Sequence, residues 1–285
     1  AGKALQNMAF SFSDFSYYLL LALVQGITEF LPVSSSGHLV LVPSITNRSD
    51  HGVSIDVAAH IGTLIAVMIY VRSDLIKMTL ALRNTALKSL RPNANILIDA
   101  PSLMMIKMLI IATIPVIIAG FLVSLFEPDM LRLVQTVAIS NIIFAIFLWH
   151  SDKTSPSEHT LSEMGLKQAL FIGLAQMLAL IPGTSRSGVT MTMARYLGFE
   201  RLSAARFSLL LSIPVIIAAG CLQIVKLIRQ EDIVVGAAAL YVAIFSCIIA
   251  LGAIHGMMKW LGRANFNLFV YYRFALGLVL LIISF

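Results

Sequence analysis

Apolar stretches long enough to cross a lipid bilayer recur along most of this chain, and two short polar motifs interrupt them. Hydrophobic residues make up 59% of the sequence and charged residues only 12%. A soluble domain of this length carries roughly twice that charged fraction. Inside a bilayer every backbone polar group must be hydrogen-bonded within the protein, so spanning segments of this kind fold as helices. The sequence therefore predicts an all-α polytopic membrane protein.

Six segments are predicted to be transmembrane helices, and two further stretches are apolar but broken near their centres. The predicted spans cover residues 55–71, 104–126, 132–150, 207–228, 234–258 and 265–285. The broken stretches cover residues 15–46 and 166–199, and each has Pro, Gly and several hydroxyl residues at its centre. Pro and Gly end a helix, and Ser or Thr can cap the next one. We therefore expect two re-entrant helical hairpins.

The distribution of Lys and Arg predicts the orientation of these segments. Basic residues gather in 72–91, which we interpret as a cytoplasmic loop because such loops carry an excess of Lys and Arg. Each half, 8–150 and 151–285, then has one hairpin, three spans and opposite orientation, which is an inverted-topology repeat. We expect one integral membrane domain, 1–285, in which residues 1–7 are a short tail or an expression remnant.

The two hairpins are predicted to approach one another inside the membrane. The first enters from the outside and the second from the inside, so their broken tips can meet near the midplane. Aligning Pro32 with Pro182 places Ser35 opposite Ser185.

Composition argues against several other classes of site. The net charge of +6 does not indicate nucleic acid, because the basic residues lie between apolar segments and form no patch interleaved with aromatic residues. Cys221 and Cys247 both fall inside apolar segments, so we expect neither a disulfide nor a thiolate metal site. The chemistry must therefore come from the two polar motifs.

The first motif, residues 25–38, brings a carboxylate, three serines and a histidine to membrane depth. Gln25 and Glu29 are four residues apart and so share one helical face. After the break, serines 34–36 are available to cap the returning helix, and His38 follows at its start. Ionisable groups at this depth are energetically expensive and by default mark function.

The second motif, residues 182–190, carries Arg186 in the first turn of the helix that follows its break. Helix N-termini present free N–H groups and a partial positive charge, which together bind anions. Two such termini that face one another, with an arginine fork between them, suit a phosphate or a diphosphate.

These groups predict phosphoryl chemistry on a substrate that resides in the membrane. Arg186 is expected to neutralise phosphoryl oxygens, with Arg273 in the last apolar segment as a second phosphate ligand. Ser35 is our candidate nucleophile, and attack by an activated water is the alternative. His38 is a candidate general acid or base, and Glu29 would bind a divalent cation or orient the histidine.

At these positions the sequence resembles the undecaprenyl-diphosphate phosphatase family, also called the bacitracin-resistance family. The first motif fits at Gln25, Glu29, Pro32, Ser34, Ser35, Gly37 and His38, and the second at Pro182, Gly183, Ser185, Arg186, Ser187, Gly188 and Thr190. The run Tyr272-Arg273-Phe274 is also similar to the family's C-terminal span. The resemblance extends from about residue 18 to the end of the chain.

The resemblance implies a bacterial plasma-membrane enzyme that removes the terminal phosphate of undecaprenyl diphosphate. The product is the monophosphate carrier that is reused in peptidoglycan and other envelope-polymer synthesis. The resemblance further implies a divalent cation, Mg or Ca, an active site that opens to the extracytoplasmic side, and reduced sensitivity to bacitracin.

The family's functional positions carry over to particular residues of this chain. The catalytic set is Glu29, Ser35, His38 and Arg186; the substrate-binding set is Ser34, Ser185, Ser187, Thr190 and Arg273; and the cation ligands are Glu29 and Gln25. Many members have Glu at the position of Gln25. Because Gln cannot take a proton as a general base, the resemblance gives no support here to a mechanism that needs two carboxylates.

Two further expectations stay open at this point. The same arginines and inverted repeat would suit a polyprenyl-phosphate flippase or scramblase, which releases no phosphate.

Asp56 and His60, four residues apart near the start of a predicted span, are weaker site candidates because that position is close to the interface. The expected partners are the polyprenyl diphosphate, membrane lipids and, as one option for assembly, a second copy of the chain.

Overall fold

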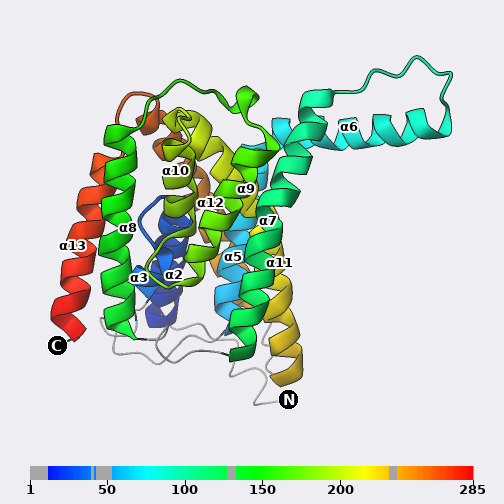
Figure 1. Cartoon of the computed structure of the whole chain (residues 1–285). Coiled ribbons are helices and arrows are strands. Elements are labelled where there is room, and N and C mark those ends of the chain that lie inside the picture. Colours follow the sequence, from blue (N-terminus) through cyan, green and yellow to red (C-terminus); the bar gives the residue numbers. More distant parts are fainter. Residues whose placement is uncertain (1–11, 40–41, 43–52, 127–132, 231–235, 285) are drawn as a thin grey trace, which may run out of the picture.

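The structure is a computed structural model that describes residues 12–39, 42, 53–126, 133–230 and 236–284 (Figure 1). Helices form nearly all of this part of the chain. The predicted tail, most of the far end of the first hairpin and two of the predicted turns lie outside the described residues.

Five helices in the described part are long and apolar enough to cross a membrane. They are α7 (Ala100–Phe126), α8 (Val134–Thr154), α11 (Arg201–Gln230), α12 (Ala237–Leu261) and α13 (Asn267–Ser284). A sixth span results if α5 (Val53–Tyr70) and α6 (Arg72–Leu90), which are bent by 77° at their junction, count as one. Each predicted span coincides with one of these helices, and the all-α membrane class is confirmed.

Residues 72–91 were expected to form a loop, and this expectation is wrong because they form helix α6. Figure 1 shows α6 projecting sideways at the end of the bundle where α5 ends. The segment has no Pro or Gly, and its Leu, Ala, Met, Lys and Arg residues all favour helix. Its basic residues indicated a loop, although Lys and Arg are good helix formers. A bidentate ion pair between Arg206 and Asp74, 2.7 Å at its shortest, connects α6 to α11.

Both predicted hairpin breaks are present. In the first, α2 (Phe12–Thr28) is followed by a turn and then α3 (Ser35–Leu39). In the second, α9 (Leu166–Gln176) and the short 3₁₀ helix η3 (Met177–Leu180) lead through a turn to α10 (Arg186–Tyr196). Figure 1 shows α9 and α10 reaching into the bundle from the end opposite to the one where α2 begins. The two broken segments therefore enter the bundle from opposite ends (Figure 1).

Helix packing links the two halves of the chain. The first helix of each hairpin packs on a spanning helix of the other half, α2 on α12 and α9 on α7, while α8 pairs with α13 and α5 lies against α11 and α12. Small residues allow two of these approaches. A Cβ at Gly62 of α5 would lie 2.1 Å from the carbonyl oxygen of Ala243, and one at Gly173 of α9 would lie 2.5 Å from that of Ala112. This packing fixes both hairpin tips inside the bundle.

Candidate active site

The two hairpin breaks have the same local construction. Ser34 and Ser185 are the only non-glycine residues with positive φ in the described chain, at 72° and 70°. Each accepts a hydrogen bond at its side-chain oxygen from the backbone N–H three residues later, at Gly37 (3.4 Å) and Gly188 (3.2 Å). A non-glycine residue in this conformation costs about 1–3 kcal/mol, and such residues cluster at functional sites. The strain occurs at the start of both returning helices.

This construction corrects the register between the two motifs. Aligning the prolines placed Ser35 opposite Ser185, but the structure matches Ser185 with Ser34 and therefore matches Ser35 with Arg186. The second turn has one extra residue, Gly183, with φ +93°. A Cβ there would lie 2.2 Å from a carbonyl oxygen of α8, so the extra residue must be glycine.

The hairpin tips meet, as predicted, through reciprocal hydrogen bonds. The backbone N–H of Gly183 donates to Ser36 Oγ at 2.9 Å. In the opposite direction, Ser187 Oγ donates to the carbonyl of Leu31 at 2.9 Å. Each tip therefore supplies a serine that satisfies the backbone of the other tip, and the polar groups of both motifs come together.

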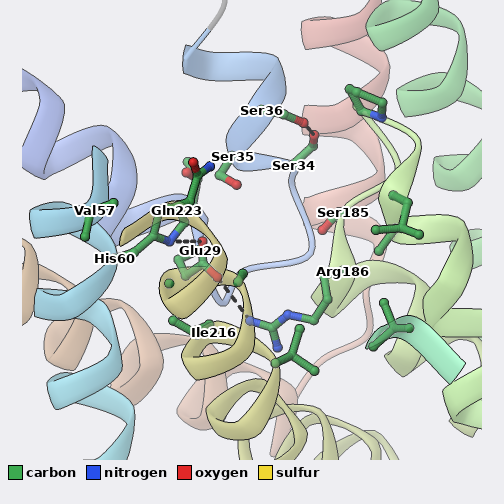
Figure 2. A pocket seen from close by; sticks show the side chains of 18 residues that line it. Glu29, Ser34, Ser35, Ser36, Val57, His60, Ser185, Arg186, Ile216 and Gln223 are labelled. Atoms are coloured by element: carbon green, nitrogen blue, oxygen red, sulfur yellow. Dashed lines mark hydrogen bonds and ion pairs between the residues drawn. The ribbon is translucent and has the colours of Figure 1, made fainter. Parts of the chain in front are cut away.

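A cavity of about 370 Å³ opens between the two tips, α5, α7, η3 and α11 (Figure 2). Its polar lining consists of Thr28, Glu29, Ser34, Ser35, Ser36, His60, Ser185, Arg186 and Gln223. Its remaining wall is apolar and includes Val116, Leu180 and Ile216. A pocket whose lining is partly polar and partly apolar suits an amphipathic ligand.

Glu29 and Arg186 form an ion pair in this cavity. Nη2 of Arg186 lies 3.2 Å from Oε1 of Glu29, and the two side chains are only 13% and 9% exposed. The guanidinium also donates to the carbonyl of Ser208 at 3.1 Å and lies over the ring of Phe30. Figure 2 shows that the pair joins the residue after the end of α2 to the start of α10. The carboxylate thus holds the guanidinium at the cavity wall.

The second carboxylate oxygen of Glu29 faces two further polar groups. Nε2 of Gln25 donates to Oε2 at 2.9 Å. The same amide nitrogen lies 2.9 Å from Nδ1 of His60, which is itself 3.7 Å from Oε2. Arg186 and His60 therefore flank Glu29 on its two sides, as Figure 2 shows.

Ser35 differs from its two serine neighbours. Ser34 and Ser36 lie 3.1 Å apart at their hydroxyl oxygens, and each also makes a bond to backbone. Ser35 lines the cavity and is partly exposed, and its hydroxyl has no hydrogen-bond partner within the part of the chain that the structure describes. A hydroxyl that is exposed to the cavity and unpaired is free to contact a ligand.

The donors at the cavity fit a divalent cation that binds together with a phosphorylated ligand. No group of three or more His, Cys, Asp or Glu side chains with metal-ligand spacing exists among the described residues. Mg²⁺ commonly binds through one or two carboxylates plus substrate phosphates, and needs no complete protein cage. Glu29 supplies one such carboxylate, while Gln25 presents its amide nitrogen to that carboxylate.

Comparison with known proteins shows the family of this chain. The model of the family described as "Bacitracin resistance protein BacA" matches residues 18–279. The chain belongs to this family. An "Undecaprenyl-diphosphatase" of Alteromonas mediterranea is 43% identical over 263 residues, which are 92% of this chain and 96% of the relative. Relatives with the same description from Roseobacter denitrificans (44%, 94% of this chain and 98% of the relative) and Maricaulis maris (42%, 93% and 97%) are similar over the same extent.

In this member of the BacA family, His38 lies apart from the cavity lining. Its Nδ1 is 2.7 Å from the carbonyl oxygen of Ser34, and its Nε2 is 2.5 Å from the hydroxyl of Tyr272. The two rings also stack, with centroids 5.5 Å apart and planes 6° apart. Both ring nitrogens are thus engaged, and His38 holds the strained Ser34 turn against α13.

Arg273 is placed behind the second hairpin and does not line the cavity. Its side chain is fully buried, and its Nη2 donates to the carbonyls of Gly183 (3.0 Å) and Thr184 (2.9 Å). Its Nε donates to Asn141 at 2.9 Å. These bonds satisfy the carbonyls of a turn that has no helical partners, so Arg273 fixes the shape of the turn.

Thr190 and Ser187 are also buried and lie outside the cavity lining. Thr190 Oγ1 is 3.0 Å from the carbonyl oxygen of Arg186 and 2.7 Å from Ser208 Oγ. The threonine therefore positions the backbone that carries the arginine. Of the predicted substrate-binding residues, Ser34 and Ser185 line the cavity.

Four polar residues of the cavity lining are absent from the predicted site set: Thr28, Ser36, His60 and Gln223. The sequence indicates Ser36 only as a helix cap and His60 only as a weaker candidate near the interface. The signal for Gln223 was a single uncharged polar residue within a predicted span, which is common. Only the packing of α5 and α11 beside the hairpins brings the side chains of His60 and Gln223 to the cavity.

Proposed function

We propose that this chain hydrolyses undecaprenyl diphosphate to undecaprenyl phosphate and inorganic phosphate, as a membrane hydrolase acting on a phosphoric anhydride. The observation that carries the proposal is the Glu29–Arg186 pair in a cavity formed by both hairpin tips. An arginine held at a helix start, in the same cavity as an unpaired serine hydroxyl, suits the binding of a diphosphate. The descriptions of the similar proteins support this reaction.

The apolar wall supports a lipid as the substrate. Val116 of α7, Leu180 of η3 and Ile216 of α11 line the same cavity as the polar residues. Gly220 on the same face of α11 has no atom within 4 Å of the position that a Cβ would take, so this wall has open space. We infer that the first isoprene units lie against this wall and the diphosphate lies at the hairpin tips.

In the proposed reaction, the terminal phosphorus is attacked by an oxygen nucleophile and undecaprenyl phosphate is the leaving group. Ser35 is the candidate nucleophile because its hydroxyl faces the cavity and is unpaired. Its Oγ–P bond forms as the P–O bond to undecaprenyl phosphate breaks and the hydroxyl proton passes to a phosphoryl oxygen. Water then hydrolyses the phosphoserine to serine and inorganic phosphate. Direct attack by water gives the same products. Arg186 neutralises the charge that the phosphoryl oxygens carry in either route.

Glu29 is the residue that would hold a divalent cation, Mg or Ca, against the diphosphate. Gln25 is buried outside the cavity lining and its amide nitrogen donates to the same carboxylate, so it would orient Glu29 and not bind the cation. The cation would supply charge stabilisation on the phosphoryl oxygens. Because Arg186 already occupies Oε1 of Glu29, only Oε2 is on the side away from the guanidinium. The proposed cation therefore depends on substrate to complete its coordination.

We propose that the protein resides in the bacterial plasma membrane with the α6 end of the bundle in the cytoplasm. The segment 72–91 carries five basic residues and one acidic residue, and an excess of Lys and Arg marks cytoplasmic segments. The cavity residues Val57 and His60 lie in the first turns of α5, and Gln223 lies in the last third of α11. Both positions are far from the α6 end, which supports an extracytoplasmic opening and a role in recycling the carrier after polymer synthesis outside.

The experiment measures phosphate release from undecaprenyl diphosphate by purified protein in detergent, with Mg²⁺ or with a chelator. We expect cation-dependent release in wild type and its loss in Arg186→Ala. A lipid flippase, the alternative that the sequence left open, would release no phosphate under these conditions. Absence of release from well-folded protein would refute the proposal.

A further inference from the structure

His60 extends from α5, a helix outside both motifs, and reaches the same carboxylate that holds Arg186. Its side chain is 42% exposed and lines the cavity. Its Nδ1 faces both Gln25 and Glu29. Figure 2 shows the contact between His60 and the Glu29 carboxylate. The neighbouring helix therefore contributes a polar group to the site at a position that neither motif occupies.

The neighbours of His60 determine which of its ring nitrogens carries the proton. An ionised carboxylate only accepts hydrogen bonds, so the Gln25 amide atom that lies 2.9 Å from Glu29 Oε2 is the nitrogen. That nitrogen has a second hydrogen and lies 2.9 Å from Nδ1 of His60. Nδ1 is therefore the acceptor, and the neutral imidazole carries its proton on Nε2.

The protonated Nε2 is on the opposite side of the ring from Gln25. No residue in the described ranges forms a hydrogen bond with it, although the ring lines the cavity. An N–H group in this position is a free donor with a fixed direction. Arg186 is on the other side of Glu29, so the carboxylate stands between two donors that both border the cavity.

We propose that the Nε2–H of His60 donates a hydrogen bond to a phosphoryl oxygen of the lipid diphosphate, on the opposite side of Glu29 from Arg186. The proposal rests on the proposed phosphatase function. Gln25 gains a role from it: as an amide it donates to both Glu29 and His60 and so fixes the histidine tautomer. A purely structural His60, which only supports Gln25, is the competing explanation.

Two amide substitutions separate these explanations. The side-chain amide of Asn reaches the position of Nδ1, so His60→Asn keeps the contact with Gln25 and removes the cavity donor. The amide of Gln reaches the position of Nε2, so His60→Gln keeps a cavity donor and loses the contact with Gln25. The matched control is His255→Asn, because His255 is exposed on α12 away from the cavity.

The readout is kcat and KM for phosphate release from undecaprenyl diphosphate in detergent, with thermal melting to verify folding. We expect His60→Asn to lower kcat/KM by about 10- to 100-fold, the range for a hydrogen bond to a charged group. The kcat/KM of His60→Gln should stay much closer to that of wild type, and the kcat/KM of the control His255→Asn should equal that of wild type. If His60→Asn is active and His60→Gln is impaired, or if both are equally impaired, the donor role is wrong while the phosphatase stands.

A second measurement does not depend on turnover. The difference between the ¹⁵N spectra of histidine-labelled wild type and His60→Gln gives the tautomer of His60. We expect the proton on Nε2, and a proton on Nδ1 would contradict the inference. If wild type releases no phosphate, the proposed function fails, and this inference fails with it.

Discussion

Arg186→Met should destabilise the protein much more than removal of a shorter ion pair at its surface. The Glu29–Arg186 contact is 3.2 Å long and both side chains are mostly buried. At an effective dielectric constant of about 20, charges at this separation interact by about 5 kcal/mol. Removing one partner of a buried pair leaves an uncompensated charge and costs about 3–5 kcal/mol.

The assay is thermal unfolding of purified protein in detergent, followed by circular dichroism. At about 2 °C per kcal/mol for a chain of this size, Arg186→Met should lower the midpoint by roughly 6–10 °C. The double variant Glu29→Gln/Arg186→Met removes both charges, so it should regain most of the lost stability and none of the phosphate release. An Arg186→Met midpoint equal to wild type would refute the reasoning.

The matched control is Arg206→Met. The Arg206–Asp74 pair is shorter, at 2.7 Å, but its side chains are 49% and 20% exposed. Exposed pairs contribute about 0–1 kcal/mol, so the control should move the midpoint little. If Arg206→Met lowered the melting midpoint more than Arg186→Met, burial would not determine which ion pair contributes more to stability.

Four other substitutions test the account of the hairpins and of the helix packing. Ser35→Ala should abolish or strongly reduce phosphate release with little change in melting, because the Ser35 hydroxyl has no partner in the described structure. Ser34→Gly should keep the fold, because glycine tolerates a φ of 72°. An active Ser35→Ala together with an unfolded Ser34→Gly would contradict the site. Gly183→Ala should lower both melting and activity, since its Cβ would lie 2.2 Å from a carbonyl oxygen of α8. Gly62→Ala should lower melting, because its Cβ would lie 2.1 Å from a carbonyl of α12, and a wild-type midpoint would show that α5 and α12 are further apart.

The positions of the spans and hairpins were predictable from the sequence because apolar length and helix-breaking residues are local properties. Segment 72–91 was not predicted as a helix because its charge suggested a loop, whereas its lack of Pro and Gly was the better signal. The meeting of the two tips followed from their opposite directions. The register between them did not, because the extra residue Gly183 adopts a φ that aligned prolines do not reveal.

Membership of the site depended on side-chain direction, which the sequence does not contain. Glu29, Ser35 and Arg186 were predicted as site residues, and they line one cavity. His38 and Arg273 have the expected chemistry, yet they point to α13 and to the second turn and support the site from outside the cavity. Their directions depend on which helices lie beside each hairpin, and this is set by the packing of the whole bundle.

The most direct test of the central claim, that the hairpin-tip cavity binds the diphosphate, is an experimental structure with a non-hydrolysable bisphosphonate analogue of a prenyl diphosphate. The account predicts the terminal phosphonate within hydrogen-bond distance of Arg186 and beside Ser35, with the prenyl chain along α11. A headgroup bound elsewhere, with this cavity empty, would contradict it.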